Sequence, residues 1–482
     1  MKKLCVLLIF ALLLSGCGKV PVEQPAAAWV SFDVFAVNDL HGRFADTEEQ
    51  PGLDELSNYL KNAGNAILLS TGDMWQGTAE SNMTNGFIIT EWMNELDFTA
   101  MTVGGHEFDW GEEILQENIG LAEFPFLGIN VYSRETDQRV AYCQSSLVVD
   151  IDGVQIGIIG AIGDCYSSIS PERSRGIYFK TGADLTALVK AESEKLRSEG
   201  VDFIIYTIHD GYDKTTSNTE AKYVSGSNLK GYYDVSLSKG YVDMVFEADS
   251  HYWYLLKDEY GVYHMQAGGN NEGVSHARVT VNKATGEAQV LTVELIPDDT
   301  YRYLKKDPVV NELLEKYAED IAPATKVLGT NNQYRNGSTI CQLVADLYCA
   351  KGLEKWGEQY DIVLGGGYIS CRSPGHLDTG EVTYAQVQSL LPFDNQITLC
   401  SIQGRDLISK FLETNHKAYY IKTTAYRESI RDSIDPNGTY YVVTDSYSAY
   451  YPYNNMTVID IYDESTYARD LVAEYITAGG FA

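Results

Sequence analysis

The sequence is poor in positive charge. Its 482 residues include 36 lysines and arginines against 67 aspartates and glutamates, which gives a formal net charge of -31 at pH 7. An acidic surface repels the phosphate backbone of nucleic acids, so this composition argues against a nucleic-acid scaffold. A small anionic substrate stays compatible with it, provided that a metal ion or an arginine cluster inverts the local field.

Cysteine and proline are also scarce, at 8 and 12 residues. No two cysteines have the CxxC spacing, which argues against a zinc ribbon. Outside the cytoplasm disulfides can form, but their pairing does not follow from sequence, and buried thiols are the alternative. With 44% hydrophobic residues, the chain has the composition of a folded protein and the length of two or three domains.

The N-terminus carries a single apolar run, from Leu4 to Leu14, behind Lys2 and Lys3. The run is too short for a permanent membrane helix and is typical of a signal peptide. The segment that follows, Leu14-Ser15-Gly16-Cys17, resembles the lipobox of bacterial lipoproteins. The alternative is an ordinary secretory signal with an incidental cysteine.

We therefore expect residues 1–17 to be a lipoprotein signal peptide and residues 18–29 to be a tether. The mature protein is then extracytoplasmic, and lipid on Cys17 anchors it to the bacterial cell membrane.

Histidine is scarce too, at 8 residues, but half of the histidines follow apolar segments that read as strands. These are His41 after Val34–Val37, His106 after Ala100–Val103, His209 after Phe203–Ile208, and His251 after Val242–Phe246. Asp39, Asp73 and Asp249 lie in the same kind of position. Taken alone, a motif such as Asp39-Leu40-His41 fits a turn with a surface histidine. Its repetition favours a metal site at the ends of strands in an α/β layered fold.

Several motifs of this chain resemble those of a known family. The motifs Asp39-Leu40-His41, Gly72-Asp73, Gly105-His106-Glu107-Phe108-Asp109, His209 and Asp249-Ser250-His251 resemble the five motifs of calcineurin-like metallophosphoesterases. Their longer form resembles the secreted bacterial 5′-nucleotidases, from about Val30 to the C-terminus. The resemblance implies an α/β (α+β) fold: a four-layer αββα sandwich over residues 30–303, a linker helix over 304–323, and a smaller mixed α/β C-terminal substrate-binding domain over 324–482.

The resemblance also implies two divalent metal ions that share one carboxylate. The first would be held by Asp39, His41, bridging Asp73 and His251, and the second by Asp73, His209 and Asp249. Gly105 replaces a family asparagine and Asp249 replaces a family histidine. We therefore expect the second ion to be weaker, or shifted toward Mg²⁺ or Mn²⁺. For the site as a whole, Zn²⁺ and Co²⁺ are further candidate ions.

Other residues receive roles from the same resemblance. His106 would stabilise the leaving oxygen while Asp109 orients it. In the C-terminal domain, Gly365–Gly367 is a glycine motif, although a flexible turn explains such a run equally well. The expected substrate-binding residues are Arg335, Arg372, Phe393, Asn395 and Tyr447, with Phe393 and Tyr447 stacking on a base. The stretch Tyr450–Asn454 replaces a glycine-rich family segment, and Tyr453 is either a ligand contact or loop packing.

The expected function is a lipid-anchored, metal-dependent phosphohydrolase that acts as a monomer on nucleotides or related phosphoesters. The changes at Gly105 and Asp249 keep an alternative open, a catalytically weak or inactive lipoprotein that binds a nucleotide or another ligand. A purely structural cell-wall protein fits poorly with the placement of the metal-type residues.

Overall fold

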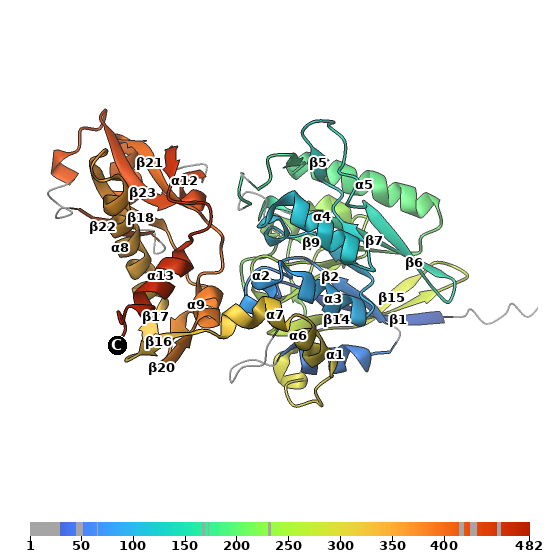
Figure 1. Ribbon diagram of the computed structural model, residues 1–482. Coiled ribbons are helices and arrows are strands. Elements are labelled where there is room, and N and C mark those ends of the chain that lie inside the picture. Colours follow the sequence, from blue (N-terminus) through green and yellow to red (C-terminus); the bar gives the residue numbers. More distant parts are fainter. Residues whose placement is uncertain are drawn as a thin grey trace, which may run out of the picture.

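The computed structural model describes residues 29–44, 52–64, 66–165, 169–171, 173–229, 233–413, 419–424, 431–450 and 455–482. The signal peptide, Cys17 and Tyr453 lie outside this part of the chain. Two lobes are visible, with helices α6 and α7 on the path of the chain between them (Figure 1). Within the described residues, no helix is both long and apolar enough to cross a membrane.

The first lobe contains two large sheets. The six-stranded sheet has the order β15-β14-β1-β2-β3-β4, and the seven-stranded sheet has the order β10-β12-β13-β11-β9-β7-β6. The strands of the first are β1 Trp29–Val37, β2 Ala66–Ser70, β3 Ala100–Thr102, β4 Phe126–Leu127, β14 Gly273–Asn282 and β15 Ala288–Pro297. Those of the second are β6 Ser146–Ile151, β7 Val154–Ile162, β9 Phe203–His209, β10 Lys222–Tyr223, β11 Met244–Phe246, β12 Trp253–Lys257 and β13 Tyr263–Ala267.

Helices cover the outer faces of these sheets. They are α1 Leu53–Lys61, α2 Ala79–Met83, α3 Phe87–Glu95, α4 Gly111–Leu121 and α5 Gly182–Ser198. The lobe also contains a separate two-stranded sheet, formed by β5 Val131–Ser133 and β8 Ile177–Phe179. Along β1, Phe35 and Val37 face the helical side while Val34 and Ala36 pack between the sheets. This alternation is what a strand buried on both faces requires. The predicted αββα sandwich is confirmed.

Parallel pairing brings the expected site residues to one edge. Strands β1, β2 and β3 run parallel in one sheet, and β7, β9 and β11 run parallel in the other. Their carboxyl ends therefore lie together, and the loops that follow them hold the candidate ligands.

The second lobe has a five-stranded sheet of order β22-β18-β23-β21-β24. Helix α8 Gly337–Trp356 packs on it, with α13 Ala468–Thr477 in the same apolar cluster. The other elements are β16 Val327–Asn331, β17 Arg335–Asn336, β18 Ile362–Tyr368, β19 His376–Leu377, β20 Gly380–Thr383, α9 Tyr384–Leu390, β21 Ile397–Gln403, α10 Gly404–Leu407, β22 Tyr419–Thr423, β23 Thr439–Asp445, α12 Ser446–Tyr450 and β24 Thr457–Ile461.

The glycine run of this lobe forms a strand and not the flexible turn offered as its alternative. Gly365, Gly366 and Gly367 all lie inside β18. A Cβ on Gly365 would stand 2.5 Å from the Cα of Cys349 in α8, and one on Gly367 would stand 2.6 Å from Thr444 Oγ1. The glycines are needed because α8 and β23 approach this strand too closely for a side chain.

The connection between the lobes differs from a single helix. It consists of α6 Val309–Lys316 and α7 Ala318–Ile321, separated at Tyr317, whose φ and ψ are -97° and 16°. Val309, Val310 and Leu313 are buried in the core cluster of the first lobe. The connection is therefore packed against that lobe along α6.

A buried charge network supports the strand end that carries Asp249. His264 lies between Glu247 and Asp258, with Nδ1 2.9 Å from Glu247 Oε1 and Nε2 3.4 Å from Asp258 Oδ2. Tyr254 donates to the other oxygen of Glu247 at 2.6 Å. Burial lowers the pKa of His264, but its hydrogen bonds to Asp258 and Glu247 outweigh burial and raise it to about 9.

This network makes a pH prediction. A histidine whose pKa is raised on folding contributes stability that is complete below its unfolded pKa of about 6.5. That contribution is lost as pH rises through about 9. The free energy of unfolding should fall across this range, by at most roughly 3 kcal/mol at about 1.4 kcal/mol per pKa unit. Denaturant unfolding of His264→Gln should show lower stability at pH 6.5 and a smaller fall in stability between pH 6.5 and about 9 than wild type. Parallel pH curves for the two proteins would contradict the assignment.

Candidate metal centre

The loops after β1 and β2 are joined by backbone hydrogen bonds. Asp39 donates from its backbone nitrogen to Gly72 O at 3.0 Å, and His41 donates to Asp73 O at 3.0 Å. The pairing of β1 with β2 thus continues past both strands, and it fixes the heights at which the side chains of Asp39, His41 and Asp73 emerge.

Five candidate ligands have left-handed backbone conformations. The φ angles are 47° at Asp39, 49° at His41, 56° at Asp73, 65° at Asp249 and 54° at His251. Residues other than glycine pay a steric cost in this region, and such strain concentrates at functional sites. The surrounding hydrogen bonds hold these backbones so that the side chains point inward.

Glu107 holds two loops together beneath the site. Its carboxylate accepts hydrogen bonds from the backbone nitrogens of Asp73 (2.9 Å), Met74 (2.9 Å) and Gly104 (2.7 Å), so it joins the loops after β2 and β3. Burial first, and then the charge of Asp73, raises the pKa of Glu107 to about 7. Glu107 was not among the expected site residues, although its place between His106 and Asp109 was the signal that could have found it.

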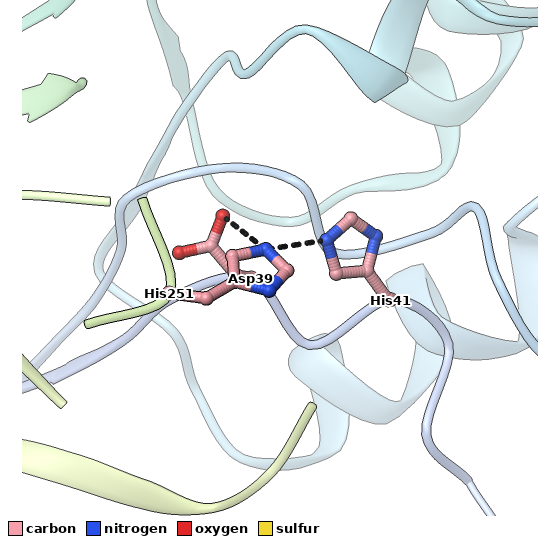
Figure 2. Close-up of side chains that lie close together, drawn as sticks. All are labelled: Asp39, His41 and His251. Atoms are coloured by element: carbon pink, nitrogen blue, oxygen red, sulfur yellow. Dashed lines mark hydrogen bonds and ion pairs between the residues drawn. The ribbon is translucent and has the colours of Figure 1, made fainter. Parts of the chain in front are cut away.

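The first cluster contains Asp39, His41 and His251 (Figure 2). The Nε2 atoms of His41 and His251 are 3.0 Å apart, and His251 Nε2 lies 3.5 Å from Asp39 Oδ1. His41 Nδ1 is 3.0 Å from Gln76 O, which makes it the donor and leaves the lone pair on Nε2. Burial, followed by the nearby His251, holds the pKa of His41 well below its usual range. A neutral imidazole with an inward lone pair is a metal ligand.

The second cluster contains Asp39, Asp73 and His209. His209 Nδ1 lies 2.7 Å from Thr71 O and donates to it, so Nε2 is the ring atom left for a proton or a metal ion. Burial lowers the pKa of His209, but the charge of Asp73 raises it well above its usual range. This Nε2 atom is buried, makes no hydrogen bond within the described residues, and faces Asp73 Oδ2 at 3.1 Å. Two acceptors at that distance repel unless a proton or a cation lies with them. The carboxylate and imidazole donors therefore fit a divalent ion.

Asp249 and Gly105 lie beside these clusters. The backbone nitrogen of Asp249 donates to both oxygens of Asp39, at 3.0 and 3.1 Å, and its carboxylate forms a third cluster with His209 and Cys165. Gly105 has a φ of -69° and a ψ of -42°, a helical conformation that any residue can adopt. The backbone conformation at this position therefore does not require a glycine.

His106 and Asp109 form a pair at the edge of the site. His106 Nδ1 lies 2.8 Å from Asp109 Oδ2, and its Nε2 lies 3.9 Å from Asp73 Oδ2. Burial lowers the pKa of His106, but the carboxylates of Asp109 and Asp73 raise it to about 9. The ring can therefore hold a proton at neutral pH next to the clustered carboxylates.

A cavity of about 310 Å³ lies between the metal-type residues of the first lobe and the second lobe. One side is formed by His41, Asp73, His106, Asp109, Asp249 and His251, and the other includes Tyr368, Arg372, Phe393, Asn395 and Tyr447. Phe393 stacks on His106 with ring centroids 5.5 Å apart, and Arg372 Nη2 lies 3.3 Å from His106 Nε2. Four of the five expected substrate-binding residues therefore share one cavity with the metal-type residues.

Arg335 is the exception. It does not line the cavity, because its guanidinium donates to Asn331 Oδ1 at 2.8 Å and stacks over the ring of Phe481 at 4.1 Å. The structure thus places Arg335 in the packing of β17 against the C-terminus, away from the other expected substrate residues.

Comparison with known proteins agrees with this architecture. A model of the 5′-nucleotidase C-terminal domain matches residues 320–427. The protein UshA of Yersinia enterocolitica is 25% identical over 480 residues, covering 86% of this chain and 83% of its own length. The 5′-nucleotidase of Vibrio vulnificus is 23% identical over 449 residues, which cover 82% of this chain and 78% of that protein. The similarity to 5′-nucleotidases and to UshA thus extends over most of this chain.

Solved structures support the fold of this chain. The 5′-nucleotidase precursor from Thermus thermophilus superposes with a TM-score of 0.70 at 18% identity, covering 93% of this chain and 96% of that chain. The predictions of the family and of its enzyme class, a phosphoester hydrolase, are confirmed by the comparisons.

Gly104 offers a test of the metal centre. A Cβ there would lie 2.6 Å from the backbone nitrogen of Asp73 and 2.8 Å from Glu107 Oε2. Gly104→Ala should displace Asp73 and lower Mn²⁺ affinity about tenfold or more, as loss of ligand orientation does. Isothermal titration with Mn²⁺ measures this effect.

Gly120→Ala is the matched control, because Gly120 lies in α4 with no atom within 4 Å of the added Cβ. That change should leave metal affinity unaltered and stabilise the helix by up to about 1 kcal/mol. Equal Mn²⁺ affinities for Gly104→Ala and wild type would show that Asp73 does not hold metal.

Proposed function

We propose that this chain is a two-metal phosphohydrolase that releases phosphate from nucleotides or related phosphoesters. One observation carries the proposal. The cavity is bordered on one side by members of the metal-type clusters, His41, Asp73, Asp249 and His251, and on the other by the aromatic residues Phe393 and Tyr447. A nucleotide has a phosphate at one end and a flat base at the other, so it matches both ends of such a cavity.

The first ion would be held by Asp39, His41, Asp73 and His251. The second would be held by Asp73, His209 and Asp249. Divalent ions bound there would supply charge stabilisation for the phosphate oxygens and lower the pKa of a bound water. The orphaned Nε2 of His209 and the carboxylates around it support this assignment.

His106 and Asp109 would assist departure of the leaving group. Asp109 accepts from His106 Nδ1, which fixes the ring and leaves Nε2 facing the cavity. Although burial lowers the pKa of His106, the carboxylate of Asp109 raises it and so favours the protonated ring, which can donate to the leaving oxygen.

The second lobe would hold the nucleoside. Phe393 and Tyr447 offer faces for stacking on a base, and Asn395 offers an amide for its edge. Arg372 lies over the ring of Phe393 at 5.0 Å and against His106, where its charge suits a phosphate group. Residues 30–303 and 324–482 act as separate domains in this proposal, and they move apart to exchange substrate.

A second candidate function is nucleotide binding without turnover. The observation that favours it is the loss of a donor at Gly105 and the carboxylate at Asp249, both beside the second ion. Weakening that ion would remove part of the electrostatic stabilisation of the transition state, which is a large contribution to catalysis.

Phosphate release distinguishes the two candidates. Purified protein supplied with Zn²⁺, Mn²⁺, Co²⁺ or Mg²⁺ should release phosphate from nucleoside monophosphates or sugar nucleotides. His106→Gln should lower kcat by about 10²–10⁴ and leave the bound metal unchanged. Tight nucleotide binding with no phosphate release under any of these ions would establish the binding function instead.

The location is part of the proposal as well. The Leu14–Cys17 motif supports lipid attachment at Cys17, which would keep the enzyme at the outer face of the cell membrane. In cells, the wild-type protein should partition with membranes and Cys17→Ala should be found in the soluble extracytoplasmic fraction. Identical fractionation of the two would rule out the lipid anchor.

A further inference from the structure

The second metal position has a thiol next to it. The ligand atoms of Cys165, His209 and Asp249 all lie within 4.8 Å of one another. Cys165 is the only cysteine in any such group within the part of the chain that the structure describes. Cys143, by contrast, is buried within an apolar cluster of the first lobe.

The fold accounts for the position of Cys165. It follows β7, which runs parallel to β9, and Ile162 at the end of β7 is in register with His209 at the end of β9. The backbone nitrogen of Gly163 donates to His209 O at 3.0 Å, and Cys165 Sγ donates to the same oxygen at 2.9 Å. The loop after β7 therefore keeps the thiol at the height of the His209 ring.

The second ion lacks a donor without this thiol. Asp73, His209 and Asp249 give three protein ligands, and Gly105 supplies none. The buried Nε2 of His209 makes no hydrogen bond within the described residues, so an unpartnered ligand atom already lies in the cluster. A thiolate here would restore the four protein donors that this position has when the family asparagine is present.

We propose that Cys165 is a thiolate ligand of the second metal ion. This inference rests on the proposed two-metal function. On binding, the Sγ–H bond that now donates to His209 O is replaced by an Sγ–metal bond, and the proton leaves to solvent. The metal does not change oxidation state.

The proposal changes the expected metal preference. With carboxylate and imidazole donors alone, the second position favours Mg²⁺ or Mn²⁺. A thiolate is a soft ligand, and it shifts preference toward Zn²⁺ or Co²⁺. The residue that compensates for Gly105 and Asp249 thus lies far from both in sequence.

Cobalt titration tests the thiolate directly, because a sulfur-to-cobalt bond gives a charge-transfer absorption in the near ultraviolet that oxygen and nitrogen ligands do not give. Wild type and the control Cys349→Ser should develop this band on addition of Co²⁺. Cys165→Ser should lack it, and Zn²⁺ affinity at the second position should fall about tenfold or more. Cys349 is a suitable control because it lies in α8 of the other lobe.

The outcomes separate the two proposals. If wild-type protein binds two Co²⁺ ions without the sulfur band, Cys165 is not a ligand, while the two-metal function stands. If wild-type protein binds no Co²⁺ or Zn²⁺, the proposed function fails as well.

A second measurement applies if Cys165→Ser does not fold. Alkylation of wild-type protein with iodoacetamide, followed by peptide mass spectrometry, should show that Zn²⁺ protects Cys165. Unchanged alkylation of Cys165 in Zn²⁺ would overturn the assignment.

Discussion

The buried carboxylate of Asp73 is the interaction on which the rest of the site depends. Its oxygens accept from the His106 backbone nitrogen at 2.8 Å and face His209 Nε2 at 3.1 Å. Its own backbone is held from both sides, by Glu107 at the nitrogen and by His41 at the carbonyl. Interactions with His209 and His106 keep the pKa of Asp73 well below its usual range although burial raises it. A carboxylate that stays charged in this way attracts a cation.

The arrangement divides the chemistry between two lobes. The first lobe supplies a rigid set of ligands, because the strand ends that carry them belong to two sheets packed face to face. The second lobe supplies Arg372 and Phe393, which contact His106 across the cavity. Substrate choice can therefore change in the second lobe without disturbing the metal ligands, and activity depends on how the two lobes meet.

Much of this could be predicted from the sequence, because each ligand follows an apolar strand and parallel strands end at one edge. The same placement indicated an α/β layered fold, and the resemblance to a known family supplied the four αββα layers. Glu107 lies inside one of the quoted motifs, but its role was missed, because the three backbone nitrogens that donate hydrogen bonds to it are identified only by the folded loops. Arg335 was expected near the substrate from the family resemblance alone, and the structure engages it with Asn331 and Phe481.

Other features could be recognised only from the folded structure. The glycines of β18 look like a turn in sequence, and only the approach of α8 explains them. Cys165 looked like an ordinary buried thiol, because its neighbours His209 and Asp249 are brought to it by the pairing of β7 with β9 and by β11. Contacts between residues far apart in sequence were in each case the missing information.

The most direct test of the central claim is the number of metal ions bound to Asp73→Asn. This change keeps the size of the side chain and removes the charge that both ions are proposed to share. Native mass spectrometry in Zn²⁺ should find two ions on wild-type protein, whereas the variant, folded by circular dichroism, should lose both. A variant that retains both ions, or a wild-type protein that saturates with one, would contradict the shared carboxylate.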